Sequence, residues 1–315
     1  MDDTDGKLCL LLSVDPRASY RELSDRLGIS VQAVHRRIQG LRDLGVISGF
    51  AANISLTYLG AVRVDVVGQT QSESIADVIR ALGKDDRVTT TLEASGHFLY
   101  VNGILRDFSE LDDFVGFVRN AAAMPKPGIA IESGSPWAPR LAKPRPGARA
   151  LSSLDIRIIR SLHTDARKST TEVASDLGVS AATVRRRLDR MINDRTIEFT
   201  TDIDPTYSGD VSSILGVTLE DNTDRLQAGA RLLQKYRPSI VYFIPFGNLP
   251  NYLACATWTR TMAALHELVK RVEAEEGVRK VVANVAVAGY RFVCWRDKLL
   301  EGTGDPHARM HASST

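Results

Sequence analysis

The sequence predicts an α+β fold in which one arrangement of two domains occurs twice along the chain, and three observations support it. The stretch from Asp15 to Ser30 returns from Asp165 to Ser180 with matching residue types, including Leu-Gly-Ile-Ser against Leu-Gly-Val-Ser. Each copy of this stretch has apolar residues at helical spacing. The sequence after each copy has the alternating pattern of strands. A repeat with a period of about 150 residues implies duplicated domains and not a solenoid.

Length and composition predict a soluble globular protein with more than one domain. The chain has 315 residues, of which 43 % are hydrophobic and 25 % are charged, as is usual for globular proteins. No run approaches the roughly 20 apolar residues of a membrane span. The acidic start is unlike a secretory signal. We therefore expect a cytoplasmic protein with no membrane partner.

Cysteine usage and charge limit the classes of site. The three cysteines are far apart and form no CxxC pair, which argues against a disulfide framework and against a zinc site. The net charge is only +2, so a polyanion would need positive charge gathered on one face. Four arginines lie within residues 185–190, and residues 140–149 form a basic run without an acid.

Residues 5–50 predict three short helices joined by tight turns. Ser19 and Glu22 have the capping-box spacing that starts a second helix, and Gly28 can adopt the positive φ that ends it. Ser30 then caps a third helix. The second copy has the same signals at Ser169, Glu172, Gly178 and Ser180. A helix, a short turn with glycine and a second helix are typical of a helix-turn-helix.

The stretch after each helical part predicts the order βαββαβ, which is that of the ferredoxin-like fold. In the first copy we expect strands at 62–66, 88–94, 98–105 and 128–131, with helices at 75–82 and 111–118. In the second copy we expect strands at 214–219, 239–244, 252–258 and 278–288, with helices at 224–236 and 261–275. Between the copies, residues 133–150 hold four prolines and no apolar periodicity, which predicts a partly extended linker. Residues 301–315 are expected to be a disordered tail.

Together these motifs resemble the Lrp/AsnC ("feast/famine") regulators. The resemblance rests on Asp-x-Arg-x-Ser, the Leu-Gly-(Ile/Val)-Ser turn, Val-x-x-Arg-(Ile/Leu) and the βαββαβ stretch, and it covers nearly the whole chain. Leu41-x-x-Leu-Gly-Val-Ile47 is also similar to the run that leads into the family's wing. The resemblance implies a tandem form, with a winged helix-turn-helix domain and a ferredoxin-like (RAM/ACT-like) sensing and dimerisation domain in each copy.

The domain boundaries expected from this are 1–56 and 151–206 for the two winged helix-turn-helix domains, 57–132 and 207–300 for the two βαββαβ domains, 133–150 for a Pro-rich basic linker and 301–315 for the tail. The implied function is sequence-specific regulation of transcription, with double-stranded DNA as the partner. The implied cellular location is the cytoplasm, in association with the nucleoid. The resemblance further implies an intramolecular pseudo-dimer, homo-oligomerisation and a small-molecule effector such as an amino acid.

The third helix of each helical part should carry the DNA contacts. A buried stripe of Val34, Ile38 and Leu41 places Gln32 and Arg36 on the opposite face. Gln pairs with adenine and Arg with guanine in the major groove, so Gln32, Arg36 and Arg186 are predicted to read bases. Arg37, Arg187 and Arg190 are predicted to contact phosphates. The full set of expected contacts is Ser30, Gln32, His35, Arg36, Arg37, Gln39, Ser180, Ala182, Thr183, Arg185, Arg186, Arg187 and Arg190.

One further interpretation of these helices stays open. The arginines could form only a solvated helix face, although their place in a helix-turn-helix in both copies favours DNA contact. The two helices also differ in sequence, and Asp189 in the second opposes phosphate binding. We therefore expect the two copies to bind unlike half-sites.

The effector site departs from the family pattern. The family's Gly-x-x-Asp landmark in the central hairpin becomes Gly96-His-Phe-Leu99 in the first copy and an Asn-containing, longer turn in the second. His97, Asn248 and Asn251 could line a modified pocket. An ordinary polar turn explains the same residues, so both interpretations remain.

An enzyme of the siroheme decarboxylase type is the main alternative, because those enzymes share this architecture. Their landmark is a His-Asn-Tyr stretch in the strand before the central hairpin, followed by a second His. The corresponding strands at 88–94 and 240–245 contain no histidine, and only His97 lies near. We therefore expect no catalytic residue, no cofactor and no metal, and a protein that is not an enzyme. A further alternative is an architectural DNA-binding protein with little sequence preference.

Overall fold

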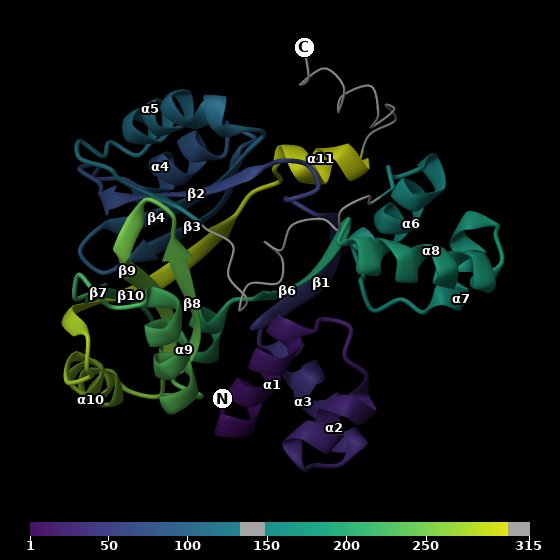
Figure 1. Ribbon diagram of the computed structural model, residues 1–315, viewed down its shortest axis with the longest axis horizontal. Coiled ribbons are helices and arrows are strands. Elements are labelled where there is room, and N and C mark those ends of the chain that lie inside the picture. Colours follow the sequence, from purple (N-terminus) through teal and green to yellow (C-terminus); the bar gives the residue numbers. More distant parts are fainter. Residues whose placement is uncertain (133–148, 302–315) are drawn as a thin grey trace. The chain divides into compact units, whose positions relative to one another are not determined.

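The computed structural model describes residues 1–132 and 149–301 (Figure 1), which form two compact units. The helix-turn-helix unit holds residues 7–61, 149–203 and 294–301, and the sheet unit holds residues 1–6, 62–132 and 204–293. The predicted linker and tail lie outside the described residues, apart from residues 149, 150 and 301. Each unit therefore combines elements from both copies of the repeat.

Each copy contributes one module of three helices and a strand to the helix-turn-helix unit. The first module has α1 (Asp3–Val14, of which the part from Lys7 belongs to this unit), α2 (Tyr20–Leu27), α3 (Val31–Asp43) and β1 (Ile47–Ile54). The second has α6 (Ser153–His163), α7 (Thr170–Leu177), α8 (Ala181–Asp194) and β6 (Ile197–Ile203). The order of helices follows the prediction in both modules.

The predicted helix caps are confirmed. The Ser19 hydroxyl accepts a hydrogen bond from the Glu22 amide while the Glu22 carboxylate accepts one from the Ser19 amide, and Ser169 and Glu172 repeat this arrangement. Each helix then ends at a glycine with φ of +66°, at Gly28 and at Gly178. Because a β-carbon disfavours this backbone conformation, glycine at both sites fixes where the turn before the third helix begins.

The predicted wings are wrong. A wing requires two strands within one module, but among the described residues each module has a single strand, and β1 and β6 pair with each other in an antiparallel two-stranded sheet (Figure 1). The register runs from Ile54 opposite Ile197 to Ile47 opposite Ile203. A strand edge presents N–H and C=O groups that can pair with another strand, and here the partner strand comes from the other module.

A reciprocal pair of arginines also joins the two modules. Arg167 donates hydrogen bonds of 2.8 Å to the carbonyl oxygens of Pro16 and Ala18. Arg17 donates to the carbonyl oxygens of Ala166 and Lys168. The two modules are therefore held at matched positions of the repeat, by the same residue type acting in both directions.

Helix α11 (Trp295–Glu301) completes the helix-turn-helix unit. The sequence assigned residues 294–300 to the second βαββαβ domain, but here they contact α6 and β1. The guanidinium of Arg296 forms an ion pair with Glu198 of β6, and both side chains are buried. Cys294 and Trp295 are buried too, in line with a packing role.

The sheet unit contains two βαββαβ halves with the same strand order. The first half has β2 (Val62–Gln69), α4 (Ile75–Leu82), β3 (Val88–Ala94), β4 (Phe98–Leu105), α5 (Leu111–Ala121) and β5 (Gly128–Ile131). The second has β7 (Val211–Leu219), α9 (Arg225–Lys235), β8 (Ile240–Phe246), β9 (Leu249–Thr259), α10 (Met262–Glu273) and β10 (Val278–Arg291). All eight strands form one sheet in the order β5-β2-β4-β3-β10-β7-β9-β8.

Strands β3 and β10 join the two halves into this continuous sheet. They pair antiparallel from Ala94 opposite Ala286 to Thr90 opposite Arg291. At the far ends of the sheet, β5 and β8 approach each other through an isolated bridge between Glu132 and Phe246. The halves thus meet at two seams, one formed by ladder pairing and one by a few contacts.

Each half has its own apolar core between sheet and helices. In the first half Phe114 of α5 is fully buried among strand residues such as Val64, Val101 and Leu99. Gly103 of β4 makes this possible, because a β-carbon there would lie 2.3 Å from Cζ of Phe114. The second half has an equivalent core, in which Phe243, Leu232 and Leu253 are buried.

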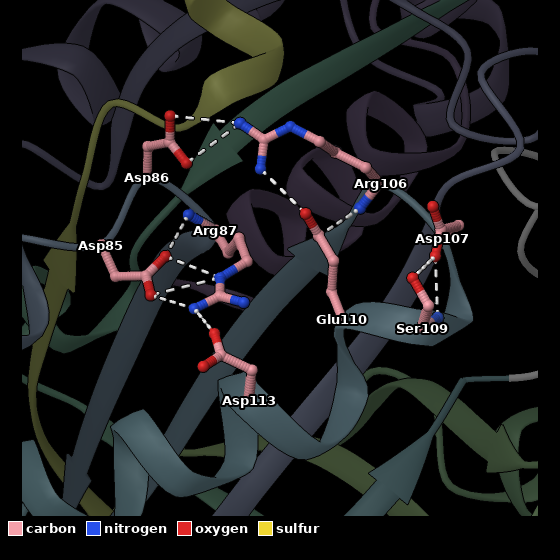
Figure 2. Close-up of polar contacts among 8 residues, drawn as sticks. All are labelled: Asp85, Asp86, Arg87, Arg106, Asp107, Ser109, Glu110 and Asp113. Carbon is pink, nitrogen blue, oxygen red and sulfur yellow. Dashed lines mark hydrogen bonds and ion pairs between the residues drawn. The ribbon is translucent and has the colours of Figure 1, made fainter. Parts of the chain in front are cut away.

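A network of charged side chains closes one end of the first half (Figure 2). Arg87, just before β3, donates to both carboxylate oxygens of Asp85 and forms a 2.8 Å ion pair with Asp113 of α5. Arg106, after β4, forms ion pairs with Asp86 and Glu110. These contacts fasten the start of α5 to the ends of two strands.

Candidate nucleic-acid interface

Helices α3 and α8 present matched exposed faces, as predicted. Val34, Ile38 and Leu41 are buried on one side of α3, and Val184, Leu188 and Met191 are buried on one side of α8. The opposite faces are exposed, with Gln32, His35, Arg36 and Gln39 on α3 and Ala182, Arg185, Arg186 and Asp189 on α8. Both helices therefore offer an open face of the kind that enters a major groove.

Three of the predicted contact residues act within the helix start. The hydroxyl of Ser30 accepts a hydrogen bond from the amide of Ala33, and the hydroxyl of Ser180 accepts one from the amide of Thr183. The hydroxyl of Thr183 also lies 2.9 Å from that of Ser180. These side chains cap the first turn of each helix.

On α3 two of the exposed side chains have neighbours that orient them. The ring of His35 lies 5.4 Å from the ring of Tyr20, centroid to centroid. The amide of Gln39 donates to the carboxylate of Asp43 at 2.8 Å. Gln32 and Arg36 are exposed on the same face of the helix.

On α8 two of the predicted phosphate contacts are engaged by a carboxylate that the sequence reasoning missed. Asp155 of α6 is fully buried, and its two carboxylate oxygens accept from Arg187 at 3.1 Å and from Arg190 at 2.6 Å. Asp155 also completes a capping box with Ser152. The Ser-x-x-Asp spacing at the start of α6 was a sequence signal for the cap, although not for the arginines.

The environment of Asp155 favours its charged form. Burial would raise the pKa of this carboxyl, but hydrogen bonds from Ser152, Arg190 and Arg187 outweigh burial and hold the pKa below the ordinary value of an aspartate. The group is therefore an anion at neutral pH. It neutralises part of the positive charge of α8 from below while the outer face stays cationic.

Two shallow surface depressions lie along α8. One, of about 580 Å³, extends along the helix from Ala182 to Asp194, with Arg185, Arg186, Asp189 and Arg190 in its lining. The other, of about 530 Å³, is bordered by Arg149, Arg186, Arg187, Arg190 and Asp194. Four guanidinium groups against one carboxylate make the second depression suited to an anion.

Two of the three residues predicted to bind an effector have structural partners. The amide group of Asn248 bridges to β5, accepting from the Ile131 amide at 2.9 Å and donating to the Ile129 carbonyl at 2.7 Å. Asn251 donates to the carboxylate of Asp221 at 2.9 Å. His97 lies exposed at the hairpin turn with φ of +57°. Asn248 thus closes the second seam of the sheet, a role that the turn pattern did not reveal.

The described residues contain no helix that is long and apolar enough to cross a membrane. Within the same part of the chain, no group of three or more His, Cys, Asp or Glu side chains is arranged to hold a metal ion. The strands that would carry the decarboxylase landmark are β3 and β8, and neither contains a histidine.

One solved structure is similar to this chain over nearly its whole length. The crystal structure of the siroheme decarboxylase NirDL superposes with a TM-score of 0.58 over 98 % of this chain and 99 % of that one, at 11 % sequence identity. At this identity the likeness concerns the fold alone. It indicates that a two-copy chain of this kind is an established architecture.

Sequence comparisons identify the helical parts and the relatives. The model of the AsnC-type helix-turn-helix domain matches residues 1–42 and 151–192. An uncharacterized HTH-type transcriptional regulator of Pyrococcus furiosus is 30 % identical over 125 residues, which are 39 % of this chain and 83 % of that protein. The HTH-type transcriptional regulator LrpA of Pyrococcus horikoshii is 30 % identical over 117 residues, which are 36 % of this chain and 83 % of that protein. The chain belongs to the Lrp/AsnC family of helix-turn-helix proteins, and it carries the family's DNA-binding domain twice.

Proposed function

We propose that this chain is a sequence-specific DNA-binding regulator of transcription whose two modules engage two unlike half-sites. The observation that carries the proposal is the pair α3 and α8: the same buried stripe, the same N-terminal cap and different exposed faces, held within one unit. Similarity to HTH-type transcriptional regulators over most of their length supports it.

The two faces differ in the chemistry that they offer to DNA. α3 presents Gln32 and Arg36, whose side chains form paired hydrogen bonds with adenine and guanine. α8 presents Ala182 at the position of Gln32 and Arg186 at the position of Arg36. The first module thus has two base-reading side chains where the second has one, so the preferred half-sites should differ in sequence.

The tandem chain acts in this proposal as a dimer within one polypeptide. Engagement of one half-site places the other module near its own half-site, which raises the effective concentration without new contacts. Half-sites should be separated by one helical turn or a multiple of it. We propose a cytoplasmic, nucleoid-associated protein, with further oligomerisation and a small-molecule effector such as an amino acid as family traits to be tested.

The decisive experiment is selection of bound fragments from sheared genomic DNA by the purified chain. The proposal expects enrichment of a composite site with two unlike halves at a fixed spacing. A symmetric palindrome would contradict the proposed asymmetry, and the absence of any enriched sequence would contradict sequence-specific binding.

A protein that only organises DNA is the nearest rival, and the same preparation tests it. Such a protein would bind a scrambled duplex as tightly as the selected one, with an equally steep dependence on salt. The regulator proposed here should prefer the selected duplex by about 10³-fold or more, as specific DNA-binding proteins do.

We propose further that the chain is not an enzyme. The architecture that it shares with a siroheme decarboxylase makes a direct test worthwhile. The purified chain should show no tetrapyrrole absorbance band after incubation with siroheme and gel filtration, and no decarboxylated product. A stoichiometric band together with product formation would favour the enzyme.

A further inference from the structure

The depression bordered by Arg149, Arg186, Arg187 and Arg190 contains side chains that the repeat does not supply in the first module. The counterparts of Arg190 and Asp194 are Gly40 and Leu44, at the same period of the repeat. The first module therefore has neither the second arginine nor the acid at these positions. The difference concerns the flank of the helix and not its base-reading face.

Asp155 lies beneath this depression and touches two of its arginines. One oxygen accepts from Nη1 of Arg187 and the other from Nη2 of Arg190. Nη1 of Arg187 also donates to the hydroxyl of Ser152 at 2.9 Å. Because Asp155 is fixed by its capping box on α6, it sets where both guanidinium groups lie.

Both guanidinium groups keep donors for a second partner. A guanidinium has five N–H donors, and the contacts with Asp155 use few of them. The side chains of Arg187 and Arg190 are 27 % and 28 % exposed. Both border the same depression as Arg149 and Arg186. The arrangement thus has a buried carboxylate behind two oriented arginines and an open cationic surface in front.

We propose that the second module holds a backbone phosphate of DNA in this depression, with Asp155 as the positioning residue, and that the first module, with Gly40 in place of Arg190, has no such pair of arginines. This rests on the proposed function. The second module would supply sequence-independent affinity for DNA. The first module, with Gln32 and Arg36, would supply more of the discrimination between bases. The two copies thus divide anchoring and reading between them.

The salt dependence of binding tests the anchor. Arg190→Gln should reduce the slope of log K against log salt by about 1, and it should weaken the selected and the scrambled duplex by the same factor. Arg231→Gln, on the exposed face of α9, removes one positive charge from the sheet unit and serves as the matched control. An unchanged slope in Arg190→Gln with normal overall DNA binding overturns the anchor alone.

Asp155→Asn separates positioning from simple neutralisation by the sign of its effect. If Asp155 positions the arginines, this variant binds DNA several-fold more weakly, although its net charge is more positive. If Asp155 only neutralises them, the variant binds more tightly, and that result overturns the positioning role. Circular dichroism and the melting temperature establish that the variant is folded before its affinity is compared.

A gain of function in the first module keeps the proposal testable if Asp155→Asn does not fold. A β-carbon at Gly40 would meet no atom within 4 Å, so Gly40→Arg can place the missing cation on α3. The expected result is a slope steeper by about 1 on a duplex with only the first module's half-site intact. Gly40→Ala controls for the gain in helix stability. Equal slopes for the two variants would contradict the proposal.

The outcomes distinguish failure of this inference from failure of the proposed function. If the wild-type chain does not bind any duplex, the regulator proposal fails and the anchor with it. If it binds a selected site while Arg190→Gln and Arg231→Gln behave alike, only the anchor fails.

Discussion

Arg17 and Arg167 occupy the same position in the two modules, and each donates hydrogen bonds to backbone carbonyls of the other module. Each also lies over an aromatic ring, Arg17 over Phe199 at 5.3 Å and Arg167 over Phe50 at 5.1 Å. Burial, and then the charge of Arg167, lower the pKa of Arg17. The two arginines thus join the modules although they carry like charges. Their contacts with carbonyl oxygens and aromatic ring faces offset the electrostatic repulsion between them.

Loss of Arg167 should destabilise the helix-turn-helix unit more than loss of Arg17. Arg167 has two hydrogen bonds of 2.8 Å, whereas the second bond of Arg17, to Lys168, is 3.4 Å long. Arg167→Met keeps the aliphatic stem, and it should lower the free energy of unfolding by about 2–3 kcal/mol because charged donors are lost. Urea denaturation of both single variants measures the difference. A larger loss in Arg17→Met would contradict this account.

Base preference should change at one half-site at a time. Gln32→Ala should cost about 1–3 kcal/mol of binding free energy on the selected site and relax preference at one position of the first half. Arg186→Ala should do the same in the second half. Binding to a library with each position randomised measures both. If either variant relaxed positions in both halves, or in neither, the assignment of α3 and α8 to separate half-sites would be wrong.

The local elements were predictable because their signals lie within a few residues. Ser19, Gly28 and Ser30 have capping and turn roles that depend only on near neighbours, and the second copy repeats them. The apolar spacing of Val34 and Ile38 likewise settled which face of α3 is buried. Where the sequence pattern specifies a backbone conformation directly, the structure agrees with it.

The long-range pairings were not predictable from these patterns. The wing was implied by the family resemblance, which does not identify the partner of each strand, and β1 pairs with β6 from the other module. Asn248 lies in a sequence that is typical of an ordinary polar turn, yet its side chain accepts a hydrogen bond from β5. Asp155 was missed since its two arginines lie one turn apart on another helix. Each of these depends on which segments the fold brings together.

The Asp85–Arg87 contact should make the stability of the first βαββαβ half depend on pH. Burial would raise the pKa of Asp85, but hydrogen bonds from Arg87 and the charges of Arg87 and Arg106 hold it below its ordinary value. A carboxyl with a depressed folded pKa stabilises the fold above its unfolded pKa of ~3.9, and this contribution is lost as pH falls through the folded pKa.

Arg87→Met should therefore cost about 3 kcal/mol at neutral pH, since Asp85 would lose the partner of a largely buried pair. The difference from wild type should shrink below pH ~4, where the carboxyl becomes protonated. Thermal unfolding of both proteins at neutral and acidic pH checks this. A difference that stays constant across that range would show that the lost packing of Arg87 on Phe114, and not the charge, is responsible.

Asn248→Ala should open the second seam of the sheet locally. The variant removes the acceptor of the Ile131 amide and the donor to the Ile129 carbonyl. Hydrogen exchange at Ile131 should become faster, while amides of the β3–β10 ladder keep wild-type rates. Asn251→Ala, which removes only a contact with Asp221, is the control. Unchanged exchange at Ile131 in Asn248→Ala would rule out this role.

The pairing of β3 with β10 also decides which proteins can share a sheet with this one. In a cell that makes several single-copy relatives, separate subunits could exchange and form mixed dimers, so that one protein's abundance would alter another's targets. Here both strands of the seam are already paired within one polypeptide. The combination of halves is inherited as one gene product, and it does not depend on the relative expression of two.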